Sequence, residues 1–208
     1  MPAGEGTPDT PLQVGHITRH THHMRKIKSL FKRDYEGTRL VYDETVPGAE
    51  WVLAGEGVAT RKFDGTCCMV QAGKLYKRYD ATVGKTPPAG FIPTQDPDPT
   101  TGHWPGWILV GDGPEDRWHR EAFTGTEPDG TYELCGPKVQ GNPEKFERHV
   151  LVPHGKEVLQ DAPRSFEALK TYLESRGIEG IVWHHPDGRM VKIKRKDFFK
   201  PARQKKYQ

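Results

Sequence analysis

Short apolar runs separated by glycine and proline dominate the chain and predict a fold rich in antiparallel β-structure. Residues 66–71 have the composition of a strand, Ala72-Gly73 that of a turn, and residues 74–79 that of the partner strand in a hairpin. The same pattern predicts short strands or connections at 39–42 and 50–53, and further strands at 131–137, 149–152, 179–185 and 190–195.

Two segments have the apolar spacing of helices. Residues 165–176 start at a favourable N-cap, Ser165, end before Gly177, and carry an apolar stripe made of Phe166, Leu169 and Leu173. Residues 24–33 predict a shorter helix, with Ile27, Leu30 and Phe31 on one side and basic residues around them. The basic side fits either a solvated surface or a contact with a phosphate backbone.

Residues 82–130 differ from the rest of the chain, because prolines alternate there with glycines and with three tryptophans. We expect a long loop insertion that packs on the domain rather than a disordered segment, since Trp104, Trp107 and Trp118 need a surface to cover. Stacking of one tryptophan on a nucleic-acid base is the alternative. The predicted organisation is a flexible tail over 1–23, one α+β domain over 24–200, and a basic tail over 201–208.

Composition places few limits on function but excludes some classes. Hydrophobic content is 34% and mean hydropathy is −0.79, no apolar run is long enough to span a membrane, and no secretory signal is recognisable, so we expect a cytoplasmic protein. Three cysteines fit neither a disulfide framework nor paired zinc ligands. The net charge of +3 is too small to imply a polyanion partner by itself, although both ends of the chain are basic.

A histidine cluster near the start of the chain leaves its function open. It comprises His16, His20, His22 and His23, with no cysteine or carboxylate at a ligand spacing. The cluster fits a solvated or phosphate-contacting segment better than a metal site.

The strongest candidate for chemistry is the sequence Lys62-Phe63-Asp64-Gly65, which follows an apolar, β-prone run. We interpret Lys62 as a nucleophile for phosphorus, which requires loss of its ammonium proton and therefore a site that lowers its pKa, such as one with other cations and a bound metal. Asp64 can bond a ribose hydroxyl or orient the lysine, and Gly65 allows close approach of a ligand. Taken alone, the same pattern also fits a surface turn after a strand.

Other charged residues fall at positions that could complete such a site. The hairpin would bring Lys77 or Arg78 to the same pocket, where an arginine could hold a phosphate through two hydrogen bonds. Strand alternation puts Glu133 opposite the face of Tyr132, and a carboxylate on an apolar strand requires a partner such as a lysine, a ribose or a metal.

The last predicted hairpin places a carboxylate and two lysines close together. Alternation directs Lys192 and Lys194 to one face of their strand, and Glu179 begins the strand before it. Paired lysines can grip a triphosphate, although an exposed sheet face would also carry them.

In this order, the motifs containing Lys62, Glu133, Glu179 and the Lys192–Lys194 pair resemble the signature of the covalent nucleotidyltransferases, which include ATP-dependent DNA and RNA ligases and mRNA capping enzymes. The segments 27–34 and 194–198 resemble the RNA ligase branch. Residues 102–107 and Thr-Cys-Cys at 66–68 are similar to the small group that contains the vertebrate 5′-to-3′ RNA ligase.

The resemblance implies a role for each matching residue. Lys62 would form a lysyl-AMP from ATP, Asp64 and Glu133 would contact the lysine or the ribose, and Glu133 and Glu179 would hold hydrated Mg²⁺ or Mn²⁺. The resemblance also implies that Lys192 and Lys194 bind the nucleotide phosphates and that Arg78 engages the 5′-phosphate of the RNA. The implied partner is RNA with 5′-phosphate and 3′-hydroxyl ends, with no membrane and no obligate protein partner.

Two features qualify the resemblance. Arg61 precedes the nucleophile at a position where some ligases carry a residue that helps to read adenine, so nucleobase selection needs another account. About ten residues follow the last match at 196–198, which favours a one-domain RNA ligase without a C-terminal oligonucleotide-binding barrel. A GTP-using capping-type guanylyltransferase and a non-catalytic RNA-binding protein with a degenerate nucleotide pocket are the alternatives.

Overall fold

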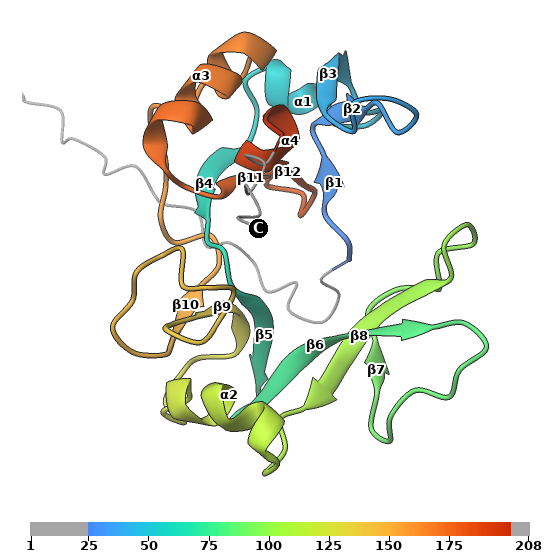
Figure 1. Ribbon diagram of the computed structural model, residues 1–208, viewed down its shortest axis with the longest axis vertical. Coiled ribbons are helices and arrows are strands. Elements are labelled where there is room, and N and C mark those ends of the chain that lie inside the picture. Colours follow the sequence, from blue (N-terminus) through green and yellow to red (C-terminus); the bar gives the residue numbers. More distant parts are fainter. Residues whose placement is uncertain (1–24, 201–208) are drawn as a thin grey trace, which may run out of the picture.

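A computed structural model describes residues 25–200 of the chain (Figure 1). Two predicted segments lie outside the described residues: the N-terminal tail 1–23, with its histidine cluster at 16–23, and the basic tail 201–208. The strands are β1 (Lys28–Ser29), β2 (Phe31–Arg33), β3 (Val41–Thr45), β4 (Val58–Lys62), β5 (Thr66–Gln71), β6 (Lys74–Thr82), β7 (Ile92–Pro93), β8 (His103–Leu109), β9 (Gly130–Cys135), β10 (Val150–Pro153), β11 (Gly180–His184) and β12 (Met190–Lys194). The helices are α1 (Glu50–Leu53), the 3₁₀ turn η1 (Pro114–Asp116), α2 (Arg117–Ala122), α3 (Phe166–Arg176) and α4 (Arg195–Phe198).

The strands form three sheets in one compact mixed α/β domain. One sheet has four strands in the order β1-β12-β11-β4, a second has six in the order β10-β9-β5-β6-β8-β7, and β2 pairs with β3. All pairings between these strands are antiparallel except that of β1 with β12. In Figure 1 the four-stranded sheet lies in the upper half with α1, α3 and α4, and the six-stranded sheet lies in the lower half with α2.

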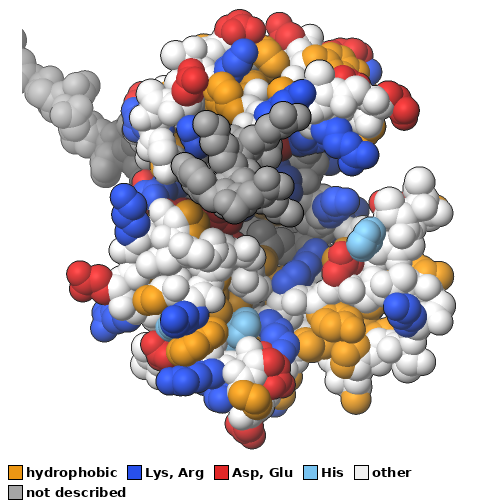
Figure 2. Space-filling model, in the orientation of Figure 1, with side chains coloured by type: hydrophobic (Ala, Val, Ile, Leu, Met, Phe, Trp, Pro, Cys, Tyr) orange, Lys and Arg blue, Asp and Glu red, His pale blue; other side chains and the backbone are white. Residues whose placement is uncertain are grey.

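The chain passes from one large sheet to the other through Phe63, Asp64 and Gly65. These residues connect β4, an edge strand of the four-stranded sheet, to β5 inside the six-stranded sheet. A cavity of about 920 Å³ has walls from both sheets (Figure 2). The predicted nucleophile, Lys62, is the last residue of β4 and therefore stands where the two walls join.

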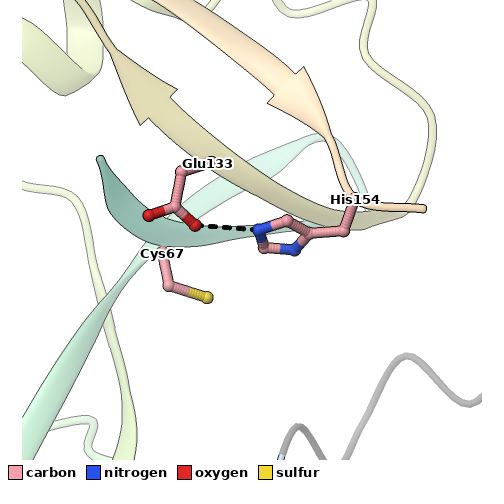
Figure 3. Close-up of side chains that lie close together, drawn as sticks. All are labelled: Cys67, Glu133 and His154. Atoms are coloured by element: carbon pink, nitrogen blue, oxygen red, sulfur yellow. Dashed lines mark hydrogen bonds and ion pairs between the residues drawn. The ribbon is translucent and has the colours of Figure 1, made fainter. Parts of the chain in front are cut away.

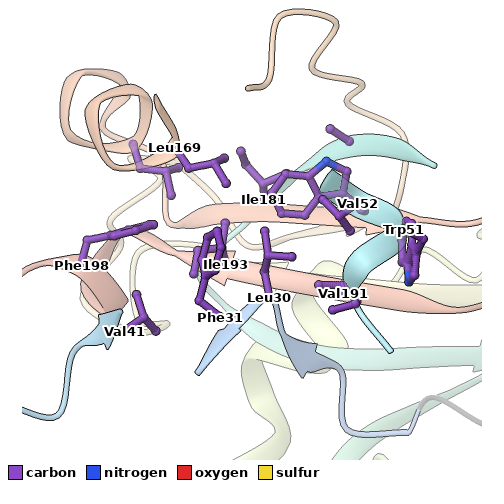
Figure 4. Close-up of a cluster of buried hydrophobic side chains, with 14 of the residues drawn as sticks. Leu30, Phe31, Val41, Trp51, Val52, Leu169, Ile181, Val191, Ile193 and Phe198 are labelled. Atoms are coloured by element: carbon purple, nitrogen blue, oxygen red, sulfur yellow. The ribbon is translucent and has the colours of Figure 1, made fainter. Parts of the chain in front are cut away.

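The main hydrophobic core supports the four-stranded sheet on the side of α1, α3 and α4 (Figure 4). Strand alternation directs Ile181, Trp183, Val191 and Ile193 into this core, where they are nearly or fully buried. Leu169 and Leu173 of α3 pack against them, so the helix keeps this sheet in place. A smaller core that includes Val70, Tyr132 and Leu134 lies under the six-stranded sheet.

Several sequence predictions are confirmed. The hairpin of β5 and β6 turns at Ala72-Gly73, both with positive φ, and strands occupy 130–135, 150–153, 180–184 and 190–194. Helix α3 begins after Ser165 and ends at Gly177, whose φ of 64° is the left-handed conformation that favours glycine. The coarse expectation of antiparallel sheets with a few short helices is likewise confirmed.

The predicted helix over 24–33 is wrong, because the described part of this segment forms β1 and β2. Leu30 joins the two strands and is fully buried; its amide donates to the carbonyl of Lys192, and its own carbonyl accepts from the amide of Val46. These partners lie far away in sequence, so the local apolar spacing could not reveal them. Residue 195, which we placed at the end of a strand, begins α4, which continues to Phe198.

The apolar run at 50–53 forms α1, not a strand. Trp51 and Val52 are adjacent and both buried. The guanidinium of Arg164 donates to the carbonyls of Val52 at 2.8 Å, Glu56 at 2.5 Å and Gly57 at 2.8 Å. A distant arginine therefore ties the end of the short helix to the turn that leads into β4.

The segment 82–130 is not a structureless loop. It contains β8, which pairs with β6 from Tyr76–Leu109 to Thr82–His103 and carries Pro105 and Gly106 in its interior. Proline and glycine are unusual in the interior of a central strand. They are tolerated in β8 because its outer neighbour is only the two-residue edge strand β7, so that β8 lies close to the edge of the sheet. The expectation that the tryptophans pack is confirmed, since Trp107 is fully buried and the Trp104 indole donates to the Gln95 carbonyl. None of the helices described is long and apolar enough to cross a membrane.

Candidate active site

The three predicted lysines converge because of strand register. Gly180 of β11 pairs with Lys62 of β4 on one side and with Lys194 of β12 on the other. Two residues along, Val182 pairs with Thr60 and Lys192. Adjacent strands lie about 4.8 Å apart, so the α-carbons of Lys62 and Lys194 flank Gly180 at about 10 Å from each other. All three lysines line the cavity.

Glu179 bridges two of these lysines. Its Oε2 lies 2.5 Å from Nζ of Lys62, and its Oε1 lies 3.2 Å from Nζ of Lys194. The carboxylate side chain is 8% exposed, so the ion pairs form in a partly desolvated environment. Gly180 follows Glu179 in the sequence and stands at the centre of the row Lys62–Gly180–Lys194, hereafter the lysine row. A Cβ at this position would lie 2.2 Å from the carbonyl oxygen of Ile193, which explains why the central residue is glycine.

The acidic neighbours change the expected protonation of Lys62. Burial alone lowers the pKa of its ammonium, but the negative charges of Glu179, Glu133 and Asp64 outweigh burial and raise the pKa above its ordinary value. Our expectation of a lowered pKa therefore does not hold for the structure without nucleotide or metal. The lysine whose pKa is lowered, to about 8, is Lys192, because of burial and the positive charges of Lys194 and Lys62.

Gly65 lines the cavity and also packs closely against β9. A Cβ at this position would lie 2.2 Å from the carbonyl oxygen of Leu134 and 2.9 Å from Cγ of Glu133, so the glycine permits close packing against β9. Its amide donates to Oε1 of Glu133 at 3.1 Å. The crossover is therefore fixed to the strand that carries one of the predicted site carboxylates.

Asp64 lies beside the cavity rather than in its wall. Burial and the nearby Glu179 carboxylate raise its pKa, whereas Lys62, Lys196 and Lys194 oppose that shift. Its side chain is thus electrostatically coupled to the lysine row, and its backbone amide donates to Glu144 Oε1 at 2.9 Å.

Glu144 is a residue of this region that sequence reasoning missed. Its Oε2 forms a 2.5 Å ion pair with Arg61, so one 5%-exposed carboxylate anchors the residue before the nucleophile and the amide of Asp64. Arg61 also contacts Glu157 at 3.3 Å. These ion pairs assign Arg61 an anchoring role. Glu144 lies outside every strand and follows no recognisable pattern, so the sequence carried no signal for it.

The six-stranded sheet contributes Arg78 and Glu133 to the opposite wall. Arg78 is half-buried, and its guanidinium lies over the Trp107 ring, 5.1 Å from the centroid. Burial lowers the pKa of this guanidinium from its ordinary value. Lys77, the alternative candidate, faces away and pairs with Asp116. Figure 2 shows lysine and arginine side chains along the hollow between the two halves.

The predicted metal ligands, Glu133 and Glu179, are both close enough to Lys62 to raise its pKa. Glu133 belongs to β9 of the six-stranded sheet, whereas Glu179 directly precedes β11 of the four-stranded sheet. Glu179 is engaged by two lysines, and Oε2 of Glu133 lies 2.9 Å from Nε2 of His154. His154 also lines the cavity. It follows Pro153, the last residue of β10, so strand alternation in the sequence could not predict the direction of its side chain.

Comparisons with known proteins agree with this arrangement. Residues 125–201 match the family model described as RNA ligase 1. RNA ligase 1 of Danio rerio is 27% identical over 245 aligned positions that cover 79% of this chain and 74% of the relative. RNA ligase 1 of Mus musculus is 26% identical with the same coverage of both chains.

The class of protein that the chain resembles is therefore the RNA ligases. In particular, the chain is similar to vertebrate RNA ligase 1 over most of its length, at about 26% identity.

Proposed function

We propose that this protein is an ATP-dependent RNA ligase that joins 5′-phosphate and 3′-hydroxyl ends through a lysyl-AMP and an RNA-adenylate. The observation that carries the proposal is the row Lys62–Gly180–Lys194, bridged by Glu179, at one wall of a cavity whose other wall presents Arg78. The cavity volume of about 920 Å³ is sufficient for a nucleotide together with an RNA end.

In the first step, the unprotonated Nζ of Lys62 attacks the α-phosphorus of ATP. A phosphorus–nitrogen bond forms, the bond to the bridging oxygen of pyrophosphate breaks, and the amine releases a proton. Lys192 and Lys194 lie two strands from Lys62, where their charges can bind the phosphates that carry the leaving negative charge.

The next two steps use the same cavity. An oxygen of the RNA 5′-phosphate attacks the phosphorus of the lysyl-AMP, the phosphorus–nitrogen bond breaks, and Lys62 regains its amine. The 3′-hydroxyl of the second RNA end then attacks the 5′-phosphate, releasing AMP and forming the phosphodiester. Arg78 can hold the 5′-phosphate through two hydrogen bonds, since its guanidinium lies in the cavity wall, over the Trp107 ring.

The residues present fit a hydrated Mg²⁺ or Mn²⁺ ion, since the donors beside Lys62 are the carboxylate oxygens of Glu179 and Glu133. Such an ion supplies charge neutralisation to the phosphates. In its absence, Glu179 holds the ammonium of Lys62. A cation that binds the Glu179 carboxylate would therefore weaken the ion pair that keeps Lys62 protonated.

The test is formation of a covalent adduct between the protein and α-labelled ATP or GTP, with Mg²⁺ or Mn²⁺, followed by denaturing electrophoresis. We expect a labelled band from ATP with the wild-type protein and none with Lys62→Ala. Lys74→Ala, which removes an exposed lysine of β6, is the matched control and should label normally.

Three outcomes would contradict the proposal. Labelling from GTP alone would indicate a capping-type guanylyltransferase, and labelling of Lys62→Ala would exclude this lysine as the nucleophile. Absence of any label, once the intact mass shows that the purified protein carries no AMP, would indicate a binding protein.

A further inference from the structure

A second group of side chains with metal-binding chemistry lies in the wall of the cavity, away from the lysine row. Cys67 of β5 pairs in register with Glu133 of β9, and His154 follows β10, the next strand in the sheet. The thiol sulfur, a carboxylate oxygen and an imidazole nitrogen all lie within 4.8 Å of one another (Figure 3). These residues are about 20 and 66 positions apart in sequence, so only the sheet brings them together.

Hydrogen bonds fix the histidine and the carboxylate in this group. Nδ1 of His154 lies 3.0 Å from the hydroxyl of Thr131, and Nε2 lies 2.9 Å from Oε2 of Glu133. The other Glu133 oxygen accepts from the amide of Gly65 at 3.1 Å. Because the carboxylate can only accept, Nε2 donates to Glu133 in this arrangement. A cation bound between them would replace that proton, and Nδ1 would then donate to the threonine, which is the arrangement found around metal-binding histidines.

We propose that Cys67, Glu133 and His154 form a binding site for a borderline divalent cation such as Zn²⁺, with one coordination position open to the cavity. Zinc bonds of about 2.0 to 2.3 Å place tetrahedral ligand atoms about 3.5 Å apart, so side-chain shifts of about 1 Å close the site. Sulfur and imidazole donors select zinc or cobalt over magnesium, which prefers oxygen. Three protein ligands and an open position also distinguish the site from a closed structural zinc site.

The site has a consequence for catalysis that rests on the proposed function. Glu133 belongs both to this group and to the carboxylates that surround Lys62. A Zn²⁺ ion held by Glu133 would remove that carboxylate from the nucleotide site and place a competing cation in the cavity. Zinc would therefore inhibit lysyl-AMP formation, in competition with the nucleotide and its hydrated metal.

The first experiment titrates the full-length protein with Co²⁺ in the absence of nucleotide and RNA. Cobalt reports its ligands, because a cysteine thiolate gives a sulfur-to-cobalt charge-transfer absorption that imidazole and carboxylate ligands do not give. We expect this absorption in the wild-type protein and in Lys62→Ala, followed by its displacement by Zn²⁺. The four histidines at 16–23 can bind Co²⁺, but they cannot produce this absorption.

Matched variants locate the site. Cys67→Ser should abolish the charge-transfer absorption, and His154→Gln and Thr131→Val should weaken Co²⁺ binding by about tenfold or more. Cys68→Ala is the control, because Cys68 faces the opposite side of β5 and is fully buried in the core. It should keep the absorption. Circular dichroism of each variant checks that the fold is intact.

An absent absorption in the wild-type protein, or one that persists in Cys67→Ser, would overturn the proposed site. The catalytic consequence has its own test in the ATP-labelling assay, where Cys67→Ser should require at least about tenfold more Zn²⁺ than wild type for the same fractional loss of label. Equal sensitivity would overturn the competition alone. A protein that gives the cobalt absorption but no label from ATP would retain the metal site and contradict the proposed function.

Discussion

At the scale of single residues, Glu179 sets the starting state of Lys62, the proposed nucleophile. Its carboxylate bridges Lys62 and Lys194 and is the largest contributor that raises the pKa of Lys62. A lysine in this state is protonated at neutral pH and must be released before it attacks phosphorus. In the proposed mechanism, Lys62 is therefore activated when a cation binds the Glu179 carboxylate in its place.

This coupling predicts the pH dependence of lysyl-AMP formation. Because the pKa of Lys62 is raised, the unprotonated fraction increases up to about tenfold per pH unit, and the wild-type rate should rise continuously between about pH 6 and 9. Glu179→Gln removes a carboxylate charge and lowers that pKa, so its rate, although smaller, should level off at a lower pH. Intact-mass measurement of single-turnover adenylation gives both profiles.

The control for this prediction is Glu44→Gln, which removes an exposed carboxylate that pairs with Lys32 outside the cavity. Its profile should match the wild-type profile. A Glu179→Gln profile that levels off at the same or a higher pH than wild type would contradict the assigned role of Glu179.

The lowered pKa of Lys192 predicts that this residue reduces the stability of the folded protein while it serves phosphate binding. Its pKa falls from 10.5 to about 8 in the folded protein, so below pH 8 the folded state holds a charge that burial disfavours. The shift corresponds to at most about 3 kcal/mol, which partial solvent contact reduces to about 1–2 kcal/mol. Lys192→Met should therefore raise the free energy of unfolding at pH 7 while impairing adenylation.

Urea unfolding of wild type and Lys192→Met measures this effect. The cost in the wild-type protein is complete below about pH 8 and decreases as pH rises toward the ordinary lysine value of 10.5, so the advantage of Lys192→Met should be constant up to about pH 8 and shrink between about pH 8 and 10. A variant that is less stable at pH 7, or whose advantage is independent of pH, would contradict the assignment.

At the scale of elements, the link from β4 to β5 depends on close packing at Gly65. A methyl group at this position would meet the Leu134 carbonyl oxygen at 2.2 Å, and backbone atoms cannot move aside as a flexible side chain can. Gly65→Ala should cost about 1–3 kcal/mol of stability and reduce adenylation, because Lys62 lies three residues away. Thermal unfolding and ATP labelling measure the two effects.

Gly111→Ala is a matched control. The nearest atom to a Cβ there is Oδ2 of Asp116 at 3.6 Å, an ordinary contact, and the glycine lies outside the cavity wall. The substitution should change stability by less than about 1 kcal/mol. If Gly65→Ala behaves in the same way, the crossover is not tightly packed against β9.

The same scale shows why sequence predicted some elements and not others. The hairpin of β5 and β6, helix α3 and the strand carrying Lys192 and Lys194 have local signals, namely turn residues, a cap and alternation, and the structure agrees with them. Segment 24–33 has helical spacing, but pairing of Leu30 with β12 and the chain before α1 overrides it. Alternation correctly directed Lys192, Lys194 and Glu133 to the cavity, whereas Glu144 and His154 lie outside regular strands and had no comparable signal.

At the scale of the whole molecule, the two sheets divide the site between them. The lysine row belongs to the four-stranded sheet, and Arg78, on β6, belongs to the six-stranded sheet. In the proposed mechanism the first wall forms the adenylate and the second positions the RNA end. A substitution on the second wall should therefore affect one step and spare the other.

Arg78→Ala should leave adduct formation with ATP close to wild type and slow AMP transfer to a 5′-phosphorylated RNA by about 10- to 100-fold, the effect of losing a charged hydrogen-bonded contact. Arg78→Lys should restore only part of the rate, because lysine lacks the planar donor pair. Single-turnover transfer from purified lysyl-AMP protein to RNA isolates this step.

Lys74→Ala, on the same strand but exposed, should change neither step. Equal losses of adduct formation and of transfer in Arg78→Ala would show that the guanidinium supports the cavity as a whole rather than the RNA end.

The strand order of the four-stranded sheet has a consequence for synthesis of the protein. All six strands of the larger sheet lie between residues 66 and 153, so that sheet can assemble early on a growing chain. The four-stranded sheet places β12 and β11 between β1 and β4, and it cannot close until residue 194 has left the ribosome. A translation product interrupted before residue 194 therefore lacks strands that surround Lys62, and in the proposed mechanism it cannot form the adenylate.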